Sequence, residues 1–206
     1  MKKIASVLFL SATVSASAFA ADQGAYVNAD LGQANFSNAT SQFSTTKFGN
    51  PGSITIGGGY HFNQNVGVEA GYSIIGDSTI TTSAGGGAST TEKLKTSSLQ
   101  LAAVGTFPIN DKFDLFGKLG LANTKIDYTA TAFGGTFVPS VAQTASASKT
   151  NLMFGIGGQF NINKRFGIRL QYQDFGKVQL PGLFFGGVNA PNIGVQVFSV
   201  GGVYNF

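Results

Sequence analysis

The sequence predicts an all-β fold, an eight-stranded antiparallel up-and-down transmembrane β-barrel, and three observations support this prediction. The 206 residues include 29 glycines and 19 phenylalanines but only 11% charged residues, a composition too apolar for a disordered chain. Apolar residues alternate with small or polar ones along eight segments, which is the periodicity of strands. The connections are alternately short and long, as in outer-membrane barrels, whose short turns are periplasmic.

Residues 1–20 are predicted to be a secretory signal peptide. Lys2 and Lys3 form a basic start, Ile4–Leu10 are mostly apolar, and Ala18–Ala20 has the small-x-small pattern of a cleavage site. The apolar run is far shorter than the ~20 residues that a spanning helix needs, which disfavours a helical anchor. Residues 21–206 are expected to form one domain, the barrel.

The second and third predicted strands show the alternation most clearly. Ser53–Phe62 and Val66–Ile74 each place apolar residues on one face and small or polar residues on the other, and the turn around Gln64 joins them into a hairpin. Two more hairpins repeat the pattern across the turns at Pro108–Lys112 and Asn163–Arg165. The eight predicted strands, in chain order, are residues 26–35, 53–62, 66–74, 99–107, 113–122, 152–162, 166–172 and 193–206.

A soluble eight-stranded barrel or sandwich is the competing fold, and it would bury the apolar face. Eight aromatic residues of that face lie beside the short turns, where closure would set them at one level, as at a membrane interface. We call this set the aromatic girdle: Tyr60, Phe62, Phe107, Phe113, Phe160, Phe166, Tyr204 and Phe206. A soluble core gives no reason for that common level, and the opposite, glycine-rich face suits a narrow interior. The membrane barrel is therefore favoured.

The expected partners follow from this location. The last strand ends on an aromatic residue, Phe206, which matches the insertion signal of outer-membrane barrels, so the barrel-assembly machinery is a predicted partner. Outer-membrane lipid and lipopolysaccharide are the others. Without Lys2 and Lys3, the 13 basic residues become 11 against 9 acidic ones, and no basic block remains. Nucleic acid is therefore not a predicted partner.

Several stretches resemble strands of the transmembrane domain of outer membrane protein A (OmpA): YVNADLG, GGYHFNQNVGVEAGYSIIG, DLFGKLG, RLQYQDFG and FSVGGVYNF. The opacity-type surface proteins look similar, and the likeness covers nearly all eight strands but not the loops. The resemblance implies a Gram-negative outer-membrane protein of the cell envelope. OmpA-like proteins often carry a periplasmic peptidoglycan-binding domain after the barrel, and this chain is expected to lack it.

Charged residues on the strands should point inward, because Lys or Arg facing lipid at mid-bilayer costs ~2–4 kcal/mol. The alternation places four charged residues on the inner face, and we call them the interior charges: Asp30, Glu69, Lys118 and Arg169. The two acids and two bases lie on opposite strands at matching heights, with Glu69 facing Arg169. Buried charges persist when paired, so an ionic plug is predicted, with Gln159 and Gln171 completing its hydrogen bonds. The resemblance implies the same Glu–Arg pair, whereas a second Lys–Glu pair of that family is replaced by Val104 and Gln159.

The predicted role is structural or one of surface interaction, with the plug filling the lumen. A narrow small-solute or ion channel is the alternative, although eight strands leave an interior only wide enough for side chains. A lipid A-modifying enzyme comes third. His61 is the one histidine, and no serine lies beside it in obvious strand register, so it is interpreted as an interior polar filler and no catalytic residue is assigned. The chain has no cysteine and no His/Asp/Glu cluster with metal spacing, so neither a metal nor a cofactor is predicted.

The last long loop, LPGLFFGGVNAP, differs from the other Ser/Thr/Gly/Ala-rich loops because it presents Leu183, Phe184 and Phe185. One interpretation is that these side chains pack on neighbouring loops or on the headgroup boundary. The other is a contact patch for a host or phage partner.

Overall fold

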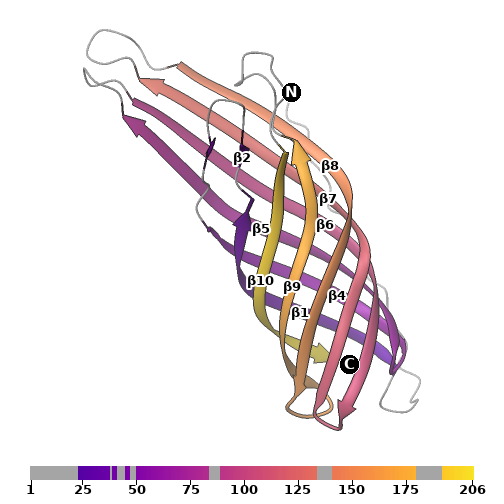
Figure 1. Ribbon diagram of the computed structural model, residues 1–206. Helices are drawn as coiled ribbons and strands as arrows, with labels where there is room; N and C mark the ends of the chain where they lie inside the picture. Colours follow the sequence, from indigo (N-terminus) through magenta and orange to yellow (C-terminus); the bar gives the residue numbers. More distant parts are fainter. Residues whose placement is uncertain are drawn as a thin grey trace, which may run out of the picture.

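The chain forms a closed antiparallel β-barrel in a computed structural model that describes residues 23–37, 39–40, 45–46, 50–83, 89–133, 141–179 and 192–206 (Figure 1). The barrel strands are β1 (Gly24–Phe36), β4 (Gly52–Asn63), β5 (Val66–Ser83), β6 (Ser89–Asn110), β7 (Phe113–Phe133), β8 (Val141–Asn161), β9 (Phe166–Gln179) and β10 (Asn192–Asn205). Each pairs with its neighbours in the chain, and β1 pairs with both β4 and β10 to close the barrel. This confirms the predicted eight-stranded, up-and-down fold.

Two short strands lie outside the barrel wall. β2 (Ala39–Thr40) and β3 (Thr45–Thr46) pair with each other within the first long connection. The predicted signal peptide, residues 1–20, and the loop residues Leu183, Phe184 and Phe185 lie outside the described residues.

The three short turns share one local mechanism. In each, an asparagine side chain accepts hydrogen bonds from the backbone N–H groups two and three residues later, which closes the chain into a tight turn. Asn63 Oδ1 accepts from Asn65 and Val66 at 2.9 Å, and Asn110 and Asn163 do the same at their turns. We call this end of the barrel the short-turn end, and the opposite one the long-loop end.

The apolar face of the strands points outward. Leu152 is 72% exposed, and Ile56 and Leu119 are exposed to a similar extent. The interior charges, by contrast, are buried inside the barrel. A soluble barrel would have the reverse arrangement, because its apolar residues must leave water. Within the described residues, no helix is long and apolar enough to cross a membrane.

The strands at the long-loop end are longer than the sequence predicted. Residues 81–93 and 129–149 were expected to be long polar loops, but residues 81–83, 89–93, 129–133 and 141–149 belong to β5, β6, β7 and β8. These strands also include residues 75–80, 94–98, 123–128 and 150–151, which lie beyond the predicted strand ends. Figure 1 shows these four strands projecting beyond the others. Among the described residues, β8 pairs with β9 only over Phe154–Asn161, so the projecting part of β8 pairs with β7 alone. Backbone ladder bonds, rather than an apolar face, define these extensions.

Candidate functional site

The four interior charges meet inside the barrel at one point. The guanidinium of Arg169 on β9 donates two parallel hydrogen bonds of 2.8 Å to the carboxylate of Asp30 on β1. Its third nitrogen donates to Glu69 Oε2 on β5 at 2.9 Å. The ammonium of Lys118 on β7 donates to Glu69 Oε1 and to Gln171 Oε1, both at 2.7 Å. Four alternate strands are thus tied together by one ionic network.

Neutral side chains complete this network. The hydroxyl of Tyr26 donates to Glu69 Oε2 at 2.9 Å, and the amide of Asn28 donates to Asp30 Oδ2 at 2.7 Å. The four charged side chains are at most 6% exposed, and the two positive charges balance the two negative ones. Buried charges in a low-dielectric interior are stable only with such pairing, so removing one charged side chain would destabilise the charges that remain.

Inward glycines leave the room that the charged side chains occupy. A Cβ atom at Gly201 on β10 would collide with the carboxylate of Asp30 and with the backbone of Ala29. At Gly59 on β4, a Cβ atom would collide with the Tyr26 ring. The glycine-rich inner face predicted from the sequence is therefore the space in which the network packs.

The pairing differs in detail from the one expected. Arg169 contacts Glu69, as the sequence argument proposed, but Arg169 also binds Asp30, while Lys118 binds Glu69. Gln171 contributes its carbonyl to Lys118. Gln159 lies in a separate cluster nearer the short-turn end, where it donates to Asn161, which in turn donates to Asp114. The expectation that Gln159 belongs to the plug was therefore wrong: its backbone position pairs with Arg169, but its amide donates toward the short-turn end, to Asn161.

A belt of hydroxyl and amide groups lies on the long-loop side of the charges. Gln173 donates to Gln100 at 2.9 Å, and Gln100 donates to Ser73 at 3.0 Å. Ser73 also shares a hydrogen bond with Thr55. The belt continues the polar interior from β9 across β6 and β5 to β4.

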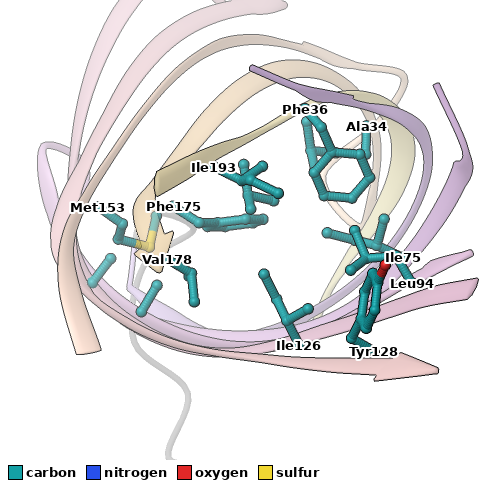
Figure 2. Packing of buried hydrophobic residues seen from close by; sticks show 14 residues of the cluster. Ala34, Phe36, Ile75, Leu94, Ile126, Tyr128, Met153, Phe175, Val178 and Ile193 are labelled. Atoms are coloured by element: carbon teal, nitrogen blue, oxygen red, sulfur yellow. The ribbon is translucent and has the colours of Figure 1, made fainter. Parts of the chain in front are cut away.

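The interior becomes apolar toward the long-loop end, a feature that the sequence reasoning missed. Figure 2 shows these side chains around the inner wall, with Phe36 and Ile75 on one side and Met153 and Phe175 on the other. We call this set the apolar layer: Ala34, Phe36, Ile75, Leu94, Ala102, Ala122, Ile126, Tyr128, Met153, Phe175, Val178, Ile193, Val195 and Val197. A signal was present, because stretches such as QVFSV and SIIG carry apolar residues on both faces rather than alternating.

The predicted aromatic girdle is placed outside the barrel at the short-turn end. Its rings contact one another in pairs: Phe113 and Phe160 lie with centroids 4.9 Å apart, and Tyr204 lies between Phe166 and Phe206, at 5.0 and 5.1 Å. Tyr60 and Phe62 form a further pair at 5.6 Å, and Phe107 is 67% exposed. Exposed rings at this level suit a membrane–water interface.

His61 faces the interior near the short-turn end. Its ring stacks on Tyr26 with centroids 4.7 Å apart, and this contact accounts for its position without any chemistry. In the part of the chain that the structure describes, no three His, Asp or Glu side chains are grouped so that they could hold a metal ion.

Comparison with known proteins identifies the family. A family model for the outer membrane protein beta-barrel domain matches residues 5–206. The structure of Ail, the attachment invasion locus protein of Yersinia pestis, is 21% identical with a TM-score of 0.56, covering 90% of this chain and 99% of that chain. The structure of Neisserial surface protein A is 18% identical with a TM-score of 0.54, covering 89% of this chain and 97% of that chain. The structure of OprG from Pseudomonas aeruginosa is 12% identical with a TM-score of 0.51, covering 90% of this chain and 97% of that chain.

None of the curated proteins compared matches the chain. At identities this low, the solved structures show the fold alone, whereas the family model spans nearly the whole sequence and agrees with the closed barrel described above. The chain therefore belongs to the outer membrane protein β-barrel family and is a protein of the outer membrane.

Proposed function

We propose that this barrel has a structural or surface-interaction role in the outer membrane and that its lumen is closed by its own side chains. The observation that carries the proposal is the ionic network, in which Arg169 spans from Asp30 to Glu69 and Lys118 completes the group. An eight-stranded barrel has an interior that side chains can fill, and here they meet near the axis. Such an arrangement leaves no continuous wide path for solutes.

Conductance of the purified protein in planar bilayers tests the closed lumen. We expect currents close to those of the bare bilayer, with a wide porin as the positive control. A large, stable, solute-sized conductance would reject the closed lumen. It would favour the second candidate, a porin-like small-solute or ion channel, for which the polar belt of Ser73, Gln100 and Gln173 is the supporting observation.

A lipid A-modifying enzyme is the least supported candidate. Acyl chemistry needs a nucleophile with a base beside it, and His61 is stacked on Tyr26 instead. We therefore propose no catalytic role. A change in the mass of lipid A on expression of the protein, abolished by His61→Ala, would overturn this assignment.

The surface role rests on the projecting strands. Of these strands, β6 carries Lys93 and Lys95 and β7 carries Lys125 beyond the lipid-facing apolar band. Lys95 and Lys125 form exposed ion pairs with Asp77 and Asp127, so the projecting part presents charges of both signs. Ail, whose fold is similar, has been solved in complex with a heparin analogue, sucrose octasulfate. The outer-membrane partners proposed for this chain are lipid and lipopolysaccharide, with host or phage contacts through the loops.

The proposed loop patch is tested by its removal. Deleting Leu183, Phe184 and Phe185 should reduce adhesion or phage adsorption of expressing cells while the barrel still assembles. Unchanged binding at equal surface levels would leave packing on neighbouring loops or headgroups as the role of these residues.

A further inference from the structure

The interior side chains change character in the same direction along several strands. From the short-turn end to the long-loop end, Ser73 is followed by Ile75 on β5, and Gln173 is followed by Phe175 on β9. On β6 Thr96 is followed by Leu94, and on β7 Thr124 is followed by Ile126, although β6 also has the small apolar residue Ala102 on its inner face nearer the short-turn end. The interior charges therefore lie on the periplasmic side of the lumen, and the large side chains of the apolar layer lie on the outer side.

The polar half is chemically suited to water. Seven buried side-chain polar atoms of the described residues have no protein partner, among them Gln171 Nε2, Gln173 Oε1 and Asn28 Oδ1. Two others of the seven, Ser53 Oγ and Thr96 Oγ1, belong to residues that pair with Ile75 at the border of the apolar layer. Buried polar atoms of this kind are normally satisfied by water. A hydrated ionic network can exchange its partners for a passing ion, so the interior charges alone are a weak barrier to small ions.

The apolar layer has the opposite chemistry. None of its 14 side chains is charged, Tyr128 supplies its one hydroxyl, and every member is at most 7% exposed. An ion that enters must leave most of its hydration shell, and only a few hydroxyls, those of Tyr128, Ser53 and Thr96, lie at this level to replace it. This is more costly than passing between charged and amide groups. Hydrophobic constrictions close channels in this way by expelling water.

We propose that the apolar layer, rather than the network of interior charges, is the seal that keeps ions from crossing this barrel. The proposal rests on the closed lumen proposed above and locates the barrier within it. The interior charges then have a different task, which is to hold four alternate strands together beneath the seal.

The test compares ion conductance after opening each level separately. The double variant Ile126→Ser/Phe175→Ser places hydroxyls in the seal, and its matched control, Leu121→Ser/Leu170→Ser, changes lipid-facing residues of the same two strands. Glu69→Gln disrupts the network. We expect the seal variant to raise conductance by on the order of tenfold or more, while Glu69→Gln and the control stay at the wild-type level.

A second pair of variants preserves side-chain shape. Val178→Thr/Val195→Thr adds two hydroxyls to the seal with almost no change in volume, and Val200→Thr adds one to the lipid face of β10. The seal variant should conduct more than its control. Folding of each protein is checked by the mobility shift of the unheated barrel on a gel. If the serine variant does not fold, the threonine variants test whether the apolar layer blocks ions.

The outcomes separate the two proposals. If the wild type is closed and Glu69→Gln opens it while the seal variants stay closed, the barrier is the ionic network and the inference is wrong. If every variant stays closed, the barrier lies elsewhere, and the inference is equally wrong. If the wild type itself conducts strongly, the closed lumen of the proposed function fails, and the seal fails with it.

Discussion

Glu69 accepts hydrogen bonds from Tyr26, Lys118 and Arg169, whose side chains come from three other strands. A carboxylate has enough lone pairs for all three donors, which is why one acid can join so many parts of the wall. The acid therefore acts as a structural centre of the interior.

Arg169 is the counterpart of Glu69, and its loss should be costly. In Arg169→Met, the carboxylates of Asp30 and Glu69 would remain buried with only Lys118 as a cation, so we expect the free energy of unfolding to fall by about 3–5 kcal/mol. Urea unfolding in lipid vesicles, followed by circular dichroism, measures this change. Arg165→Met, at an exposed turn position, is the control and should cost no more than about 0.5 kcal/mol. Equal losses in both variants would mean that the network adds nothing.

Asp127 offers a test at the projecting part of β7, beyond the lipid-facing band. A hydrogen bond from Ser146, and another from Lys125, lower the pKa of the Asp127 carboxyl below its usual value. Because that pKa is lowered by folding, the interaction is present above the unfolded pKa and is lost as pH falls through the folded pKa. Ser146→Ala should raise the pKa of Asp127 toward its usual value, measured by NMR titration of the side-chain carboxyl. An unchanged pKa would show that β7 and β8 are not joined here.

The sequence predicted which charged residues face inward but not all of their partners. Alternation alone places Asp30, Glu69, Lys118 and Arg169 on the inner face, and the structure has them there. Their pairing depends on how far each side chain reaches across the lumen and on the stagger between strands. Arg169 is long enough to bind two acids at once, which a comparison of strand positions does not reveal.

At the scale of the strand, two adjacent glycines of β10 face opposite ways. Gly201 points inward, where a Cβ atom would collide with Asp30, whereas a Cβ atom at Gly202 would meet nothing within 4 Å. Gly201→Ala should therefore destabilise the barrel by about 1–3 kcal/mol through overpacking. Gly202→Ala should be neutral or about 0.5–1 kcal/mol more stable, because glycine weakens a strand interior. Urea titration of both variants measures the contrast, and a similar effect of the two substitutions would contradict the inward packing of β10.

Strand ends were the least predictable part of the elements. The middle of β7, with Leu119 and Leu121 outward and Lys118 inward, alternates plainly. Its continuation beyond Ala122 has polar residues outside and mixed residues inside, so no apolar face marks it as a strand. Pairing with β6 and β8 continues there all the same, because the backbone groups of each strand satisfy those of its neighbours.

At the scale of the whole molecule, the barrel consists of levels that several strands build together. The apolar layer draws on every barrel strand except β4, and its members come into contact only after the stagger of the strands is fixed. A sequence shows each strand separately, so Ile75 and Phe175 look like unrelated apolar residues near strand ends. The aromatic girdle was predictable by contrast, because each short turn marks the level for the two strands it joins.

Substituting Phe206 tests whether the short-turn end also directs insertion of the barrel by the assembly machinery. Its ring is 76% exposed and packs edge-on against Tyr204, while its backbone N–H donates to Ala25 on the neighbouring strand. Removing the ring takes little from the folded barrel, because most of its surface faces lipid. If the ring is instead read by the assembly machinery, Phe206→Ala should reduce the assembled fraction in cells, measured by the mobility shift of unheated outer-membrane samples, and leave refolding into vesicles unchanged.

The matched control for Phe206 is another girdle residue. Phe62 is 54% exposed and contacts Tyr60 with the rings tilted by 58°, but it lies beside an internal turn. Phe62→Ala should assemble in cells as the wild type does, since it removes a similar ring from the same interface without touching the last strand. Equal assembly defects in the two variants would assign the effect to the girdle as a membrane anchor, whereas a defect confined to Phe206→Ala would assign it to recognition of the chain end.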